Sequence, residues 1–356
     1  MKILVLNDGF KGNLNQSLGI AQAFHSTEIE ILDVKLKGPV YRLPFRKGSY
    51  PLLSKLLSIL CVFKLWRCGK VFLKFLLKEQ KDILKKEFTV IISAGSILAP
   101  VNLILARGQK AISVNIMVPS IIPLKLFDFA VIPYHDFIKL RDKKQKNLIV
   151  TLGAPNCITE EMLKKERKEL RKVLTLPEEK EIIGILIGGN DQNYTISIRW
   201  IKELFRSIEP LKSRYNFIIT TSRRTEKEVV SFILEKIQYD RAFIYAEFPG
   251  YSKRTFYPGI LSLCRYILVT EDSINMVSEA ATSGSGVLIL GVERRNEKRL
   301  IFDKTLEKLI EKGYAEYLPV DKVRSIIEKI IGISNKKFNK LNEAEECAQK
   351  ILQNIM

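Results

Sequence analysis

Residues 269–284 read Val269-Thr270-Glu271-Asp272-Ser273-Ile274-Asn275-Met276-Val277-Ser278-Glu279-Ala280-Ala281-Thr282-Ser283-Gly284. The stretch begins as an apolar strand, turns through polar residues and continues as a helix whose end Gly284 marks. Ser273 lies in the first turn of this predicted helix. Glu279 lies two turns into it, where a carboxylate can accept hydrogen bonds from vicinal hydroxyls; the alternative is a capped helix with a surface carboxylate. The stretch therefore predicts a βα unit with a candidate ligand site at its turn.

The same pattern recurs along the chain. Short runs rich in Val and Ile end at Gly, Pro, Asn or Asp and are followed by helical patterns, which favours parallel sheets of βαβ units. Strands are predicted at Lys2–Leu6, Glu28–Leu32, Thr89–Ser93, Ala111–Ile116, Phe129–Ile132, Leu148–Thr151, Ile182–Ile187, Asn216–Thr220, Ala242–Tyr245, Tyr266–Val269 and Val287–Leu290. The fold class is therefore α/β, with two successive Rossmann-like domains as the simplest assembly.

The domain boundary is expected in a linker over 154–160. Pro155 precedes Thr159-Glu160-Glu161, which has the composition of a helix N-cap. We predict an N-terminal domain over 1–153, a C-terminal domain over 161–330 and an amphipathic C-terminal helix over 331–356. A chain of 356 residues is long enough for two such cores, and two lobes facing each other across a cleft are the default expectation.

The charge of the chain is strongly positive. Its 58 Lys and Arg against 39 Asp and Glu give a formal net charge of +19, which attracts polyanions. No zinc-finger spacing, aromatic RNA-binding signature or helix-turn-helix pattern accompanies the charge, so phosphate or anionic lipid is favoured over nucleic acid. The five cysteines are scattered without a CxxC pair, which disfavours a disulfide framework and structural zinc. Because the N-terminus reads as a strand and not as a signal peptide, we expect a cytoplasmic protein.

One stretch departs from the βαβ pattern. Between Lys35 and Lys78 there is no Asp or Glu, whereas cations punctuate an apolar background over residues 42–78. On a helix the side chains of Lys64, Arg67, Lys70, Lys74 and Lys78 gather on one arc, and apolar residues cover the rest. The cations are too frequent for a bilayer-spanning helix but suit the interfacial plane of an anionic membrane. The alternative is an ordinary domain helix with a solvated basic face. We expect peripheral association with the inner face of the cell membrane.

Glycine-containing loops follow the first strand of each predicted domain. Gly12 and Asn13 belong to a turn between a strand and a helix, where backbone N–H groups can meet an anion. Gly188-Gly189-Asn190 occupies the equivalent place in the second domain. The next strand there is followed by Ser222-Arg223-Arg224, which combines a hydroxyl with two fixed cations. Each loop alone can be a plain turn, but neighbouring strand ends of one sheet favour a shared phosphate ligand.

Several of these runs together resemble the ELM (elongated mitochondria, mitochondrial fission) family. The resemblance extends from residue 8 to about 284 and rests on Asp8-Gly9-Phe10-Lys11-Gly12-Asn13, Asn15-Gln16, Pro133-Tyr134-His135-Asp136, Leu152-Gly153-Ala154-Pro155-Asn156, Gly188-Gly189, Thr221-Ser222-Arg223-Arg224-Thr225 and Thr270-Glu271-Asp272-Ser273 with Met276 and Ser278-Glu279-Ala280. It implies a GT-B fold of the glycosyltransferase type. In plants the family is known as a factor that recruits a dynamin-related protein to mitochondria.

The segment Val277–Gly284 also looks like the donor-binding helix of MurG, a membrane-associated N-acetylglucosaminyltransferase. By that resemblance Glu279 would hold the donor ribose, and Gly188, Gly189 and Ser273 would surround the diphosphate. The remaining expected donor contacts lie in the same loops, at Asp272 and Met276. MurG-like enzymes have a Gly-rich first loop ending in His, which this chain lacks, so the identity of the base stays open.

Two residues are candidates for the catalytic base. Asp8 and His135 each follow a predicted strand of the first domain, where a base near an acceptor hydroxyl is needed. Because Arg223, Arg224 and helix N-terminal amides can stabilise the leaving diphosphate and no DxD triplet is present, we predict a metal-independent enzyme without a cofactor. Its donor is expected to be a nucleotide sugar, UDP-linked, and its acceptor lipid-anchored or part of the cell envelope. A non-catalytic membrane scaffold is the alternative; a nicotinamide-dependent epimerase lacks its fingerprint.

Overall fold

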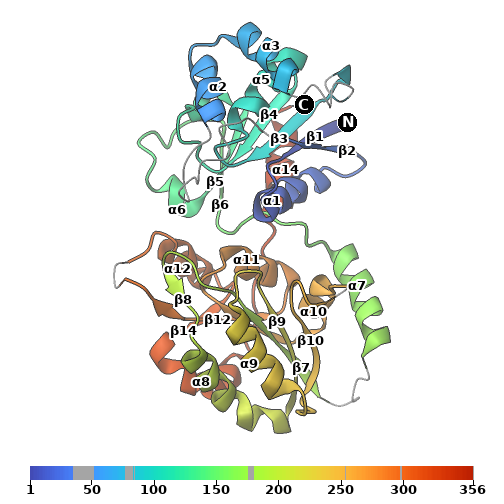
Figure 1. Cartoon of the computed structure of the whole chain (residues 1–356), viewed down its shortest axis with the longest axis vertical. Coiled ribbons are helices and arrows are strands. Elements are labelled where there is room, and N and C mark those ends of the chain that lie inside the picture. The colour runs from blue at the N-terminus through green and yellow to red at the C-terminus, as the bar shows by residue number, and fades with distance from the viewer. Residues whose placement is uncertain are drawn as a thin grey trace. The chain divides into compact units, whose positions relative to one another are not determined.

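The computed structural model of the chain describes residues 1–34, 52–76, 83, 85–174, 180–252, 254–296 and 299–355. It divides into two compact units, each of which has its own sheet (Figure 1). The N-terminal unit comprises Met1–Cys157 and Asn342–Met356, and the C-terminal unit comprises Ile158–Leu341.

The N-terminal unit contains a six-stranded parallel sheet with the strand order β2-β1-β3-β4-β5-β6. Its strands are β1 (Lys2–Asn7), β2 (Glu28–Asp33), β3 (Val90–Ala94), β4 (Ile112–Ile116), β5 (Phe129–Pro133) and β6 (Leu148–Thr151). Alternate residues of β1 point to opposite faces of the sheet, and both faces are buried: Ile3 and Val5 lie in one hydrophobic cluster and Leu4 and Leu6 in another.

Helices cover both faces of this sheet (Figure 1). The cluster around Ile3 and Val5 includes residues of α1 (Lys11–Gln22) and α14 (Glu343–Gln353), so the last helix of the chain belongs to the first unit. The cluster around Leu4 and Leu6 includes residues of α2 (Leu52–Val62), α3 (Trp66–Leu76) and α5 (Ala99–Gln109). Two short helices follow, η3 (Leu124–Leu126) and α6 (Tyr134–Phe137).

The C-terminal unit repeats the architecture. Its parallel sheet has the order β10-β9-β7-β11-β12-β14. The strands are β7 (Glu181–Ile187), β9 (Tyr215–Thr221), β10 (Phe243–Glu247), β11 (Tyr266–Thr270), β12 (Gly286–Leu290) and β14 (Glu316–Leu318). Two short strands, β8 (Tyr194–Thr195) and β13 (Glu293–Arg294), form a separate antiparallel pair.

The helices of this unit also lie on both faces of its sheet. One face packs against α8 (Ile198–Ile208), α9 (Lys227–Ile237) and α13 (Ile326–Ile333), with Trp200, Ile233 and Ile330 in the core. On the other face, the Sγ of Cys264, directly after α10 (Tyr257–Leu263), lies 2.8 Å from where a Cβ on Gly184 of β7 would be. The further helices are α7 (Glu160–Val173), η4 (Glu209–Ser213), α11 (Ile274–Ser283), α12 (Asp303–Glu311) and η5 (Val320–Ser325).

The predicted strands are all present, with ends that differ by two residues or fewer, whereas β8, β13 and β14 were not predicted. The helix start at Thr159 is confirmed, because its hydroxyl accepts a hydrogen bond from the N–H of Met162 (3.2 Å). Gly284 ends α11 with a left-handed φ of 85°. The division between the units falls after Cys157, inside the stretch predicted as the linker.

Two predicted helices differ from the structure. Residues 331–356 do not form one helix: after α13 ends at Ile333, the N–H groups of Asn339 and Leu341 bond to the carbonyls of Gly313 and Ala281, so the chain runs as a connection until α14. The basic arc from Lys64 to Lys78 does not lie on one helix either, because Lys64 occupies the turn between α2 and α3 with a φ of 56°. Residues 42–51, 77 and 78 of that stretch lie outside the described residues, as does the side chain of Lys74.

Both sheets change direction at one internal point, and these points position the loops discussed below. In the N-terminal unit β1 connects outward to β2, and β3 then pairs on the other side of β1. In the C-terminal unit β7, β9 and β10 progress one way before β11 pairs on the other side of β7. In open α/β sheets ligands bind at such points, outside the carboxyl ends of the strands.

A buried carboxylate attaches the C-terminal helix to the end of the first unit. Oε1 of Glu343, in the first turn of α14, accepts hydrogen bonds from the N–H groups of Leu152 (2.6 Å) and Gly153 (2.9 Å). Burial raises the pKa of Glu343 from 4.5 to about 7, against the lowering effect of these two hydrogen bonds. The folded protein therefore binds a proton at this site more tightly than the unfolded chain does.

This raised pKa predicts a pH-dependent stability. Between about pH 4.5 and pH 7 the folded state holds more protons than the unfolded state, so the free energy of unfolding falls as the pH rises through this window. Glu343→Gln, which keeps an oxygen acceptor and the volume, should remove this decline. Urea unfolding of both proteins at pH 5, 6, 7 and 8 measures it; parallel pH profiles would show that Glu343 ionises normally in the folded protein.

Candidate functional site

The two glycines after β7 are held by side chains from the loop after β11. The N–H of Gly188 donates to Oγ1 of Thr270 (2.7 Å), and the N–H of Gly189 donates to Oδ2 of Asp272 (2.9 Å). A Cβ on Gly188 would lie 2.1 Å from the carboxylate oxygens of Asp272, and one on Gly189 would lie 2.2 Å from the backbone of Arg224. Both glycines are therefore needed for close packing. Their amides already have acceptors within the protein and are not available for a phosphate.

Asp272 joins three loops of the carboxyl edge. Besides the amide of Gly189, its Oδ2 accepts a hydrogen bond from Nη2 of Arg224 (2.7 Å), whose Nη1 donates to the carbonyl of Gly189 (2.9 Å). Its side chain is fully buried, and this burial raises the pKa of Asp272, opposed by the hydrogen bonds from Thr270, Gly189 and Arg224. Asp272 and Arg224 therefore bind each other. Each was predicted to contact the phosphate directly, but the structure pairs the two side chains instead.

Of the other predicted residues of these loops, two are bonded within the protein and one is not. Asn190 uses its amide group within the protein, donating to Glu226 (2.6 Å) and accepting from the N–H of Ile196 (2.6 Å). Oγ of Ser222 accepts from the N–H of Arg224 (3.0 Å). Arg223, by contrast, is exposed and makes no ion pair or hydrogen bond with any residue that the structure describes. Of the two adjacent arginines, Arg224 is bonded to Asp272 and to the carbonyl of Gly189, whereas Arg223 has no partner among the described residues.

The N-terminus of α11 presents amides without a side-chain cap. Ser273 is the N-cap residue, and its side chain makes no capping hydrogen bond. The first turn of a helix has N–H groups without intrahelical acceptors, and the helix dipole adds partial positive charge there. The half-buried Met276 lies in this first turn. This helix end is therefore the element of the edge best suited to an anionic group.

Glu279 lies six residues after Ser273, about 9 Å along the helix axis at 1.5 Å per residue. It is half-buried, and its charge is a cause, after burial, of the strongly raised pKa of Tyr257 in α10. Glu247, at the end of β10, raises the same pKa and accepts a hydrogen bond from the N–H of Phe256 (2.6 Å). Glu279 thus lies close to Tyr257 at the carboxyl side of the sheet, a neighbour that the sequence analysis did not identify.

A buried ion network after β12 was also missed. Oε2 of Glu271 accepts from Nη2 of Arg294 (2.8 Å), which also pairs with both carboxylate oxygens of Asp303 (2.8 and 2.9 Å). Oε1 of Glu271 accepts from the N–H of Val292 (3.1 Å). The two carboxylates raise the pKa of Arg294 despite its burial. The sequence does contain a signal for this loop: Arg294-Arg295 follow a strand, as Arg223-Arg224 do.

In the N-terminal unit, Asp8 organises the first loop. Its Oδ1 accepts from the N–H of Phe10 (3.0 Å) and its Oδ2 from the side-chain amide of Asn13 (2.8 Å). Gly9 has a left-handed φ of 85° and Gly12 lies in the first turn of α1. Asn13 also lies beside Gly95 after β3, where a Cβ would be 3.3 Å from its Nδ2. The structure therefore brings Asp8 and Asn13 together at the point where the sheet changes direction.

His135 lies in α6, after β5, apart from Asp8. Two strands, β3 and β4, separate β1 from β5, which puts the two strand ends about 14 Å apart at 4.8 Å per strand. Nε2 of His135 is 3.8 Å from Oδ2 of Asp136. Burial lowers the pKa of His135 below 6.5, although Asp136 opposes this, so the imidazole is neutral at neutral pH, as a general base must be. The two candidate bases cannot act on one proton together.

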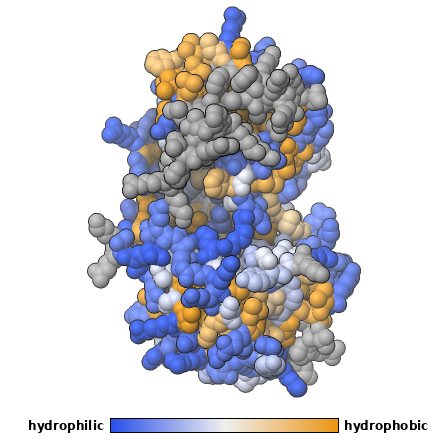
Figure 2. Space-filling view, viewed as in Figure 1, coloured by the Kyte–Doolittle hydropathy of each residue, from blue (hydrophilic) through white to orange (hydrophobic). Residues whose placement is uncertain are grey.

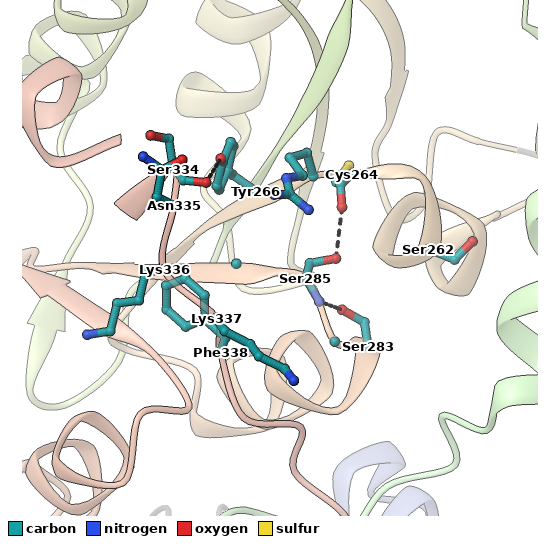
Figure 3. A pocket seen from close by; sticks show the side chains of 13 residues that line it. Ser262, Cys264, Tyr266, Ser283, Ser285, Ser334, Asn335, Lys336, Lys337 and Phe338 are labelled. Atoms are coloured by element: carbon teal, nitrogen blue, oxygen red, sulfur yellow. Dashed lines mark hydrogen bonds between the residues drawn. The ribbon is translucent and has the colours of Figure 1, made fainter. Parts of the chain in front are cut away.

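A surface pocket of about 640 Å³ lies at the opposite, amino-terminal edge of the C-terminal sheet (Figure 3). None of the predicted ligand residues lines it. Helices α10, α11 and α13 all end at this edge, and helix C-termini carry partial negative charge that disfavours phosphate. One lining cation, Lys336, already pairs with Glu316. Among the described residues, no group of three or more His, Cys, Asp or Glu could hold a metal ion.

The packing role of Gly189 can be separated from a role in ligand binding. In Gly189→Ala the new Cβ would overlap the backbone of Arg224, which cannot rotate away, so we expect a loss of about 1–3 kcal/mol in unfolding free energy without any ligand. Gly332→Ala in α13 is the matched control, since a Cβ there meets nothing within 4 Å and should not destabilise. Equal urea midpoints for Gly189→Ala and the wild type would refute the packing role.

Solved structures resemble this chain over its whole length. The UDP-GlcNAc 2-epimerase of Neisseria meningitidis, solved with UDP-GlcNAc bound, matches with a TM-score of 0.58 and 13% identity over 99% of this chain and 100% of its own. Anabaena Alr3699/HepE, solved with UDP and glucose, matches with a TM-score of 0.51 and 13% identity over 100% of this chain and 99% of its own. At such identities the likeness shows the fold alone, the GT-B fold of two Rossmann-like domains.

Sequence comparison gives the family. An uncharacterised protein of Rickettsia prowazekii (strain Madrid E), RP120, is 29% identical over 296 residues, which cover 74% of this chain and 78% of that protein. The family model for mitochondrial fission ELM1 matches residues 11–355. The match continues past residue 284, where the runs that carry the resemblance end. The chain belongs to the mitochondrial fission ELM1 family.

Proposed function

We propose that this protein is a glycosyltransferase that moves a sugar from a nucleoside diphosphate, UDP-linked, to a lipid-anchored or cell-envelope acceptor at the cytoplasmic face of the membrane. The observation that carries the proposal is the N-terminus of α11, which has no side-chain cap and is followed two turns later by the half-buried Glu279. An anionic diphosphate suits the first feature and a ribose diol the second.

The spacing of these two features supports a single nucleotide as their ligand. Ser273 and Glu279 are about 9 Å apart along one helix, a span comparable to the reach from the diphosphate to the ribose hydroxyls of an extended nucleotide. Arg223 adds an exposed cation after β9 for the leaving diphosphate. UDP or a UDP-sugar is bound in the structurally similar proteins from N. meningitidis and Anabaena, which supports uridine as the nucleoside of the donor.

The acceptor half of the proposal rests on the N-terminal unit and on charge. A net charge of +19 favours residence at an anionic surface, where lipid-linked acceptors are found. For the base we retain the two alternatives, Asp8 and His135. The neutral imidazole of His135 is in the protonation state that proton abstraction needs, whereas the carboxylate of Asp8 already accepts two hydrogen bonds.

Two other functions are distinguished by the reaction products. A UDP-sugar 2-epimerase shares this fold, and a non-catalytic scaffold would keep the fold without binding nucleotide. Purified protein incubated with a bacterial lipid extract and UDP-GlcNAc that carries a radiolabel in its sugar should release UDP and transfer the label to the lipid. A C2-epimerised sugar seen by proton NMR would establish the epimerase, and the absence of any nucleotide-dependent thermal shift would favour the scaffold.

Removing the carboxylate of Glu279, which we propose binds the ribose, should abolish nucleotide binding. UDP at saturating concentration should raise the melting temperature of the wild type, because a ligand that binds only the folded state stabilises it. We expect no such shift for Glu279→Ala. The control is Glu235→Ala, an exposed carboxylate on α9, which should keep the full shift. A full shift in Glu279→Ala would remove the ribose assignment.

The two adjacent arginines should separate binding from stability. Arg223→Ala should weaken UDP binding by about ten- to a hundredfold, since a charge-assisted hydrogen bond contributes about 1.5–3 kcal/mol, and leave the apo melting temperature unchanged. Arg224→Ala should lower the apo melting temperature, because it leaves the buried carboxylate of Asp272 without its guanidinium. Titration calorimetry and thermal melts measure both. The reverse pattern would show that the two roles are exchanged.

A further inference from the structure

Helix α2 is apolar on two faces: it buries Leu57 and Cys61 in the core together with two serines, and it exposes other large apolar residues to solvent. Ser54 and Ser58 are fully buried, whereas Leu56 and Ile59 are each 46% exposed and Phe63, directly after the helix, is 71% exposed. A helix that packs on a sheet normally turns its apolar stripe inward. The outward face of α2 therefore lacks a cover within the described part of the chain.

The inward face is closely packed, so this orientation is well defined. Oγ of Ser54 donates to the carbonyl of Ile97 (2.9 Å), and Sγ of Cys61 donates to the carbonyl of Pro100 (3.7 Å). Oγ of Ser58 donates a hydrogen bond to the carbonyl of Ser54 (2.7 Å). In α3, Gly69 contacts Ile104 of α5, where a Cβ would lie 2.8 Å from its side chain. Small residues thus dock the α2–α3 hairpin, residues 52–76, on α5.

The exposed face continues from α2 into α3. Val71 is 70% exposed and Leu65 is also exposed, and apolar surface lies over α2 and α3 at the top of Figure 2. The exposed cations of the hairpin are Lys55, Lys64, Arg67 and Lys70. No acidic residue occurs anywhere between Lys35 and Lys78. The hairpin therefore presents large aliphatic and aromatic side chains flanked by cations whose charge nothing in this stretch neutralises.

We propose that the outward face of the α2–α3 hairpin docks in the interfacial plane of a bilayer that contains anionic lipids. Leu56, Ile59, Phe63 and Val71 would enter the acyl boundary, while Lys64 and Arg67 reach the headgroup phosphates with their long side chains. Each helix has 11 residues, about 16 Å, too short to cross a bilayer. No helix among the described residues is long and apolar enough to span a membrane.

Charge favours a lipid surface over a second copy of this chain. Apposing two hairpins would bring their like-charged Lys and Arg residues together without a carboxylate from either stretch, which costs several kcal/mol in an interface. An anionic bilayer instead gains about 1 kcal/mol from each Lys or Arg near its surface. Trp66, at the start of α3, packs partly against the core of this unit, and its remaining exposed surface suits the aromatic preference of the membrane interface.

Vesicle binding of the full-length protein tests the proposal without any nucleotide or activity. The protein should sediment with vesicles of phosphatidylcholine and phosphatidylglycerol and not with phosphatidylcholine alone. Leu56→Ser/Ile59→Ser/Phe63→Ser and, separately, Lys64→Glu/Arg67→Glu should each weaken this binding at least tenfold. Brominated lipids should quench Trp66 fluorescence, and the quenching should disappear in Trp66→Phe; Trp200, the other tryptophan, is buried.

Matched controls use residues of the C-terminal unit. Val173→Ser/Ile331→Ser removes two apolar side chains that are each 59% exposed, and Lys165→Glu/Lys168→Glu reverses two exposed charges on α7; both should bind as the wild type does. The four multiple-substitution variants should melt as the wild type does, since they change only exposed side chains. Undiminished binding by either hairpin variant would overturn the proposal. Absence of vesicle binding, with self-association that the Ser variants abolish, would assign the face to a second copy.

Discussion

The hydrogen bonds that the buried carboxylate of Asp272 accepts hold together the loops at the carboxyl edge of the C-terminal sheet. One oxygen accepts the amide of Gly189 and the guanidinium of Arg224, so the loops after β7, β9 and β11 converge on a single side chain. A buried charge is tolerated only when it is paired in this way, and breaking one partner leaves it uncompensated. Because Asp272 directly precedes the N-cap residue Ser273, this contact also sets where α11 begins. The placement of the candidate nucleotide site follows from it.

This arrangement divides the residues around the switch point into two groups. Gly188, Gly189 and Arg224 build the edge by packing and hydrogen bonding among themselves, and they leave little for a ligand. The N-terminus of α11 has no side-chain cap, Arg223 is exposed, and Glu279 lies close to Tyr257. A first domain with an Asp8–Asn13 contact at its own switch point has the same construction on a smaller scale. Each sheet therefore uses some loop residues to fix others.

The fold could be predicted from the sequence because its signals are local. Buried parallel strands are short runs of Val and Ile that need no knowledge of their neighbours, and Thr159 and Gly284 mark helix ends by their own side chain or backbone. The site was predicted only in part. That Gly188 meets Thr270, 82 residues away, depends on tertiary contacts that spacing does not encode. The burial of Ser54 and Ser58 likewise contradicts their polarity, and only the surface of α5 explains it.

Hydrogen–deuterium exchange with and without saturating UDP tests most directly whether the end of α11 holds the nucleotide. First-turn amides that donate to a diphosphate should exchange more slowly, so we expect UDP to protect residues 274–276, together with the segments that contain Glu279 and its neighbour Tyr257. The amides of Gly188 and Gly189, already bonded within the protein, should be slow in both states and change little. Protection confined to Gly188–Asn190, or none at 274–276, would contradict the assignment.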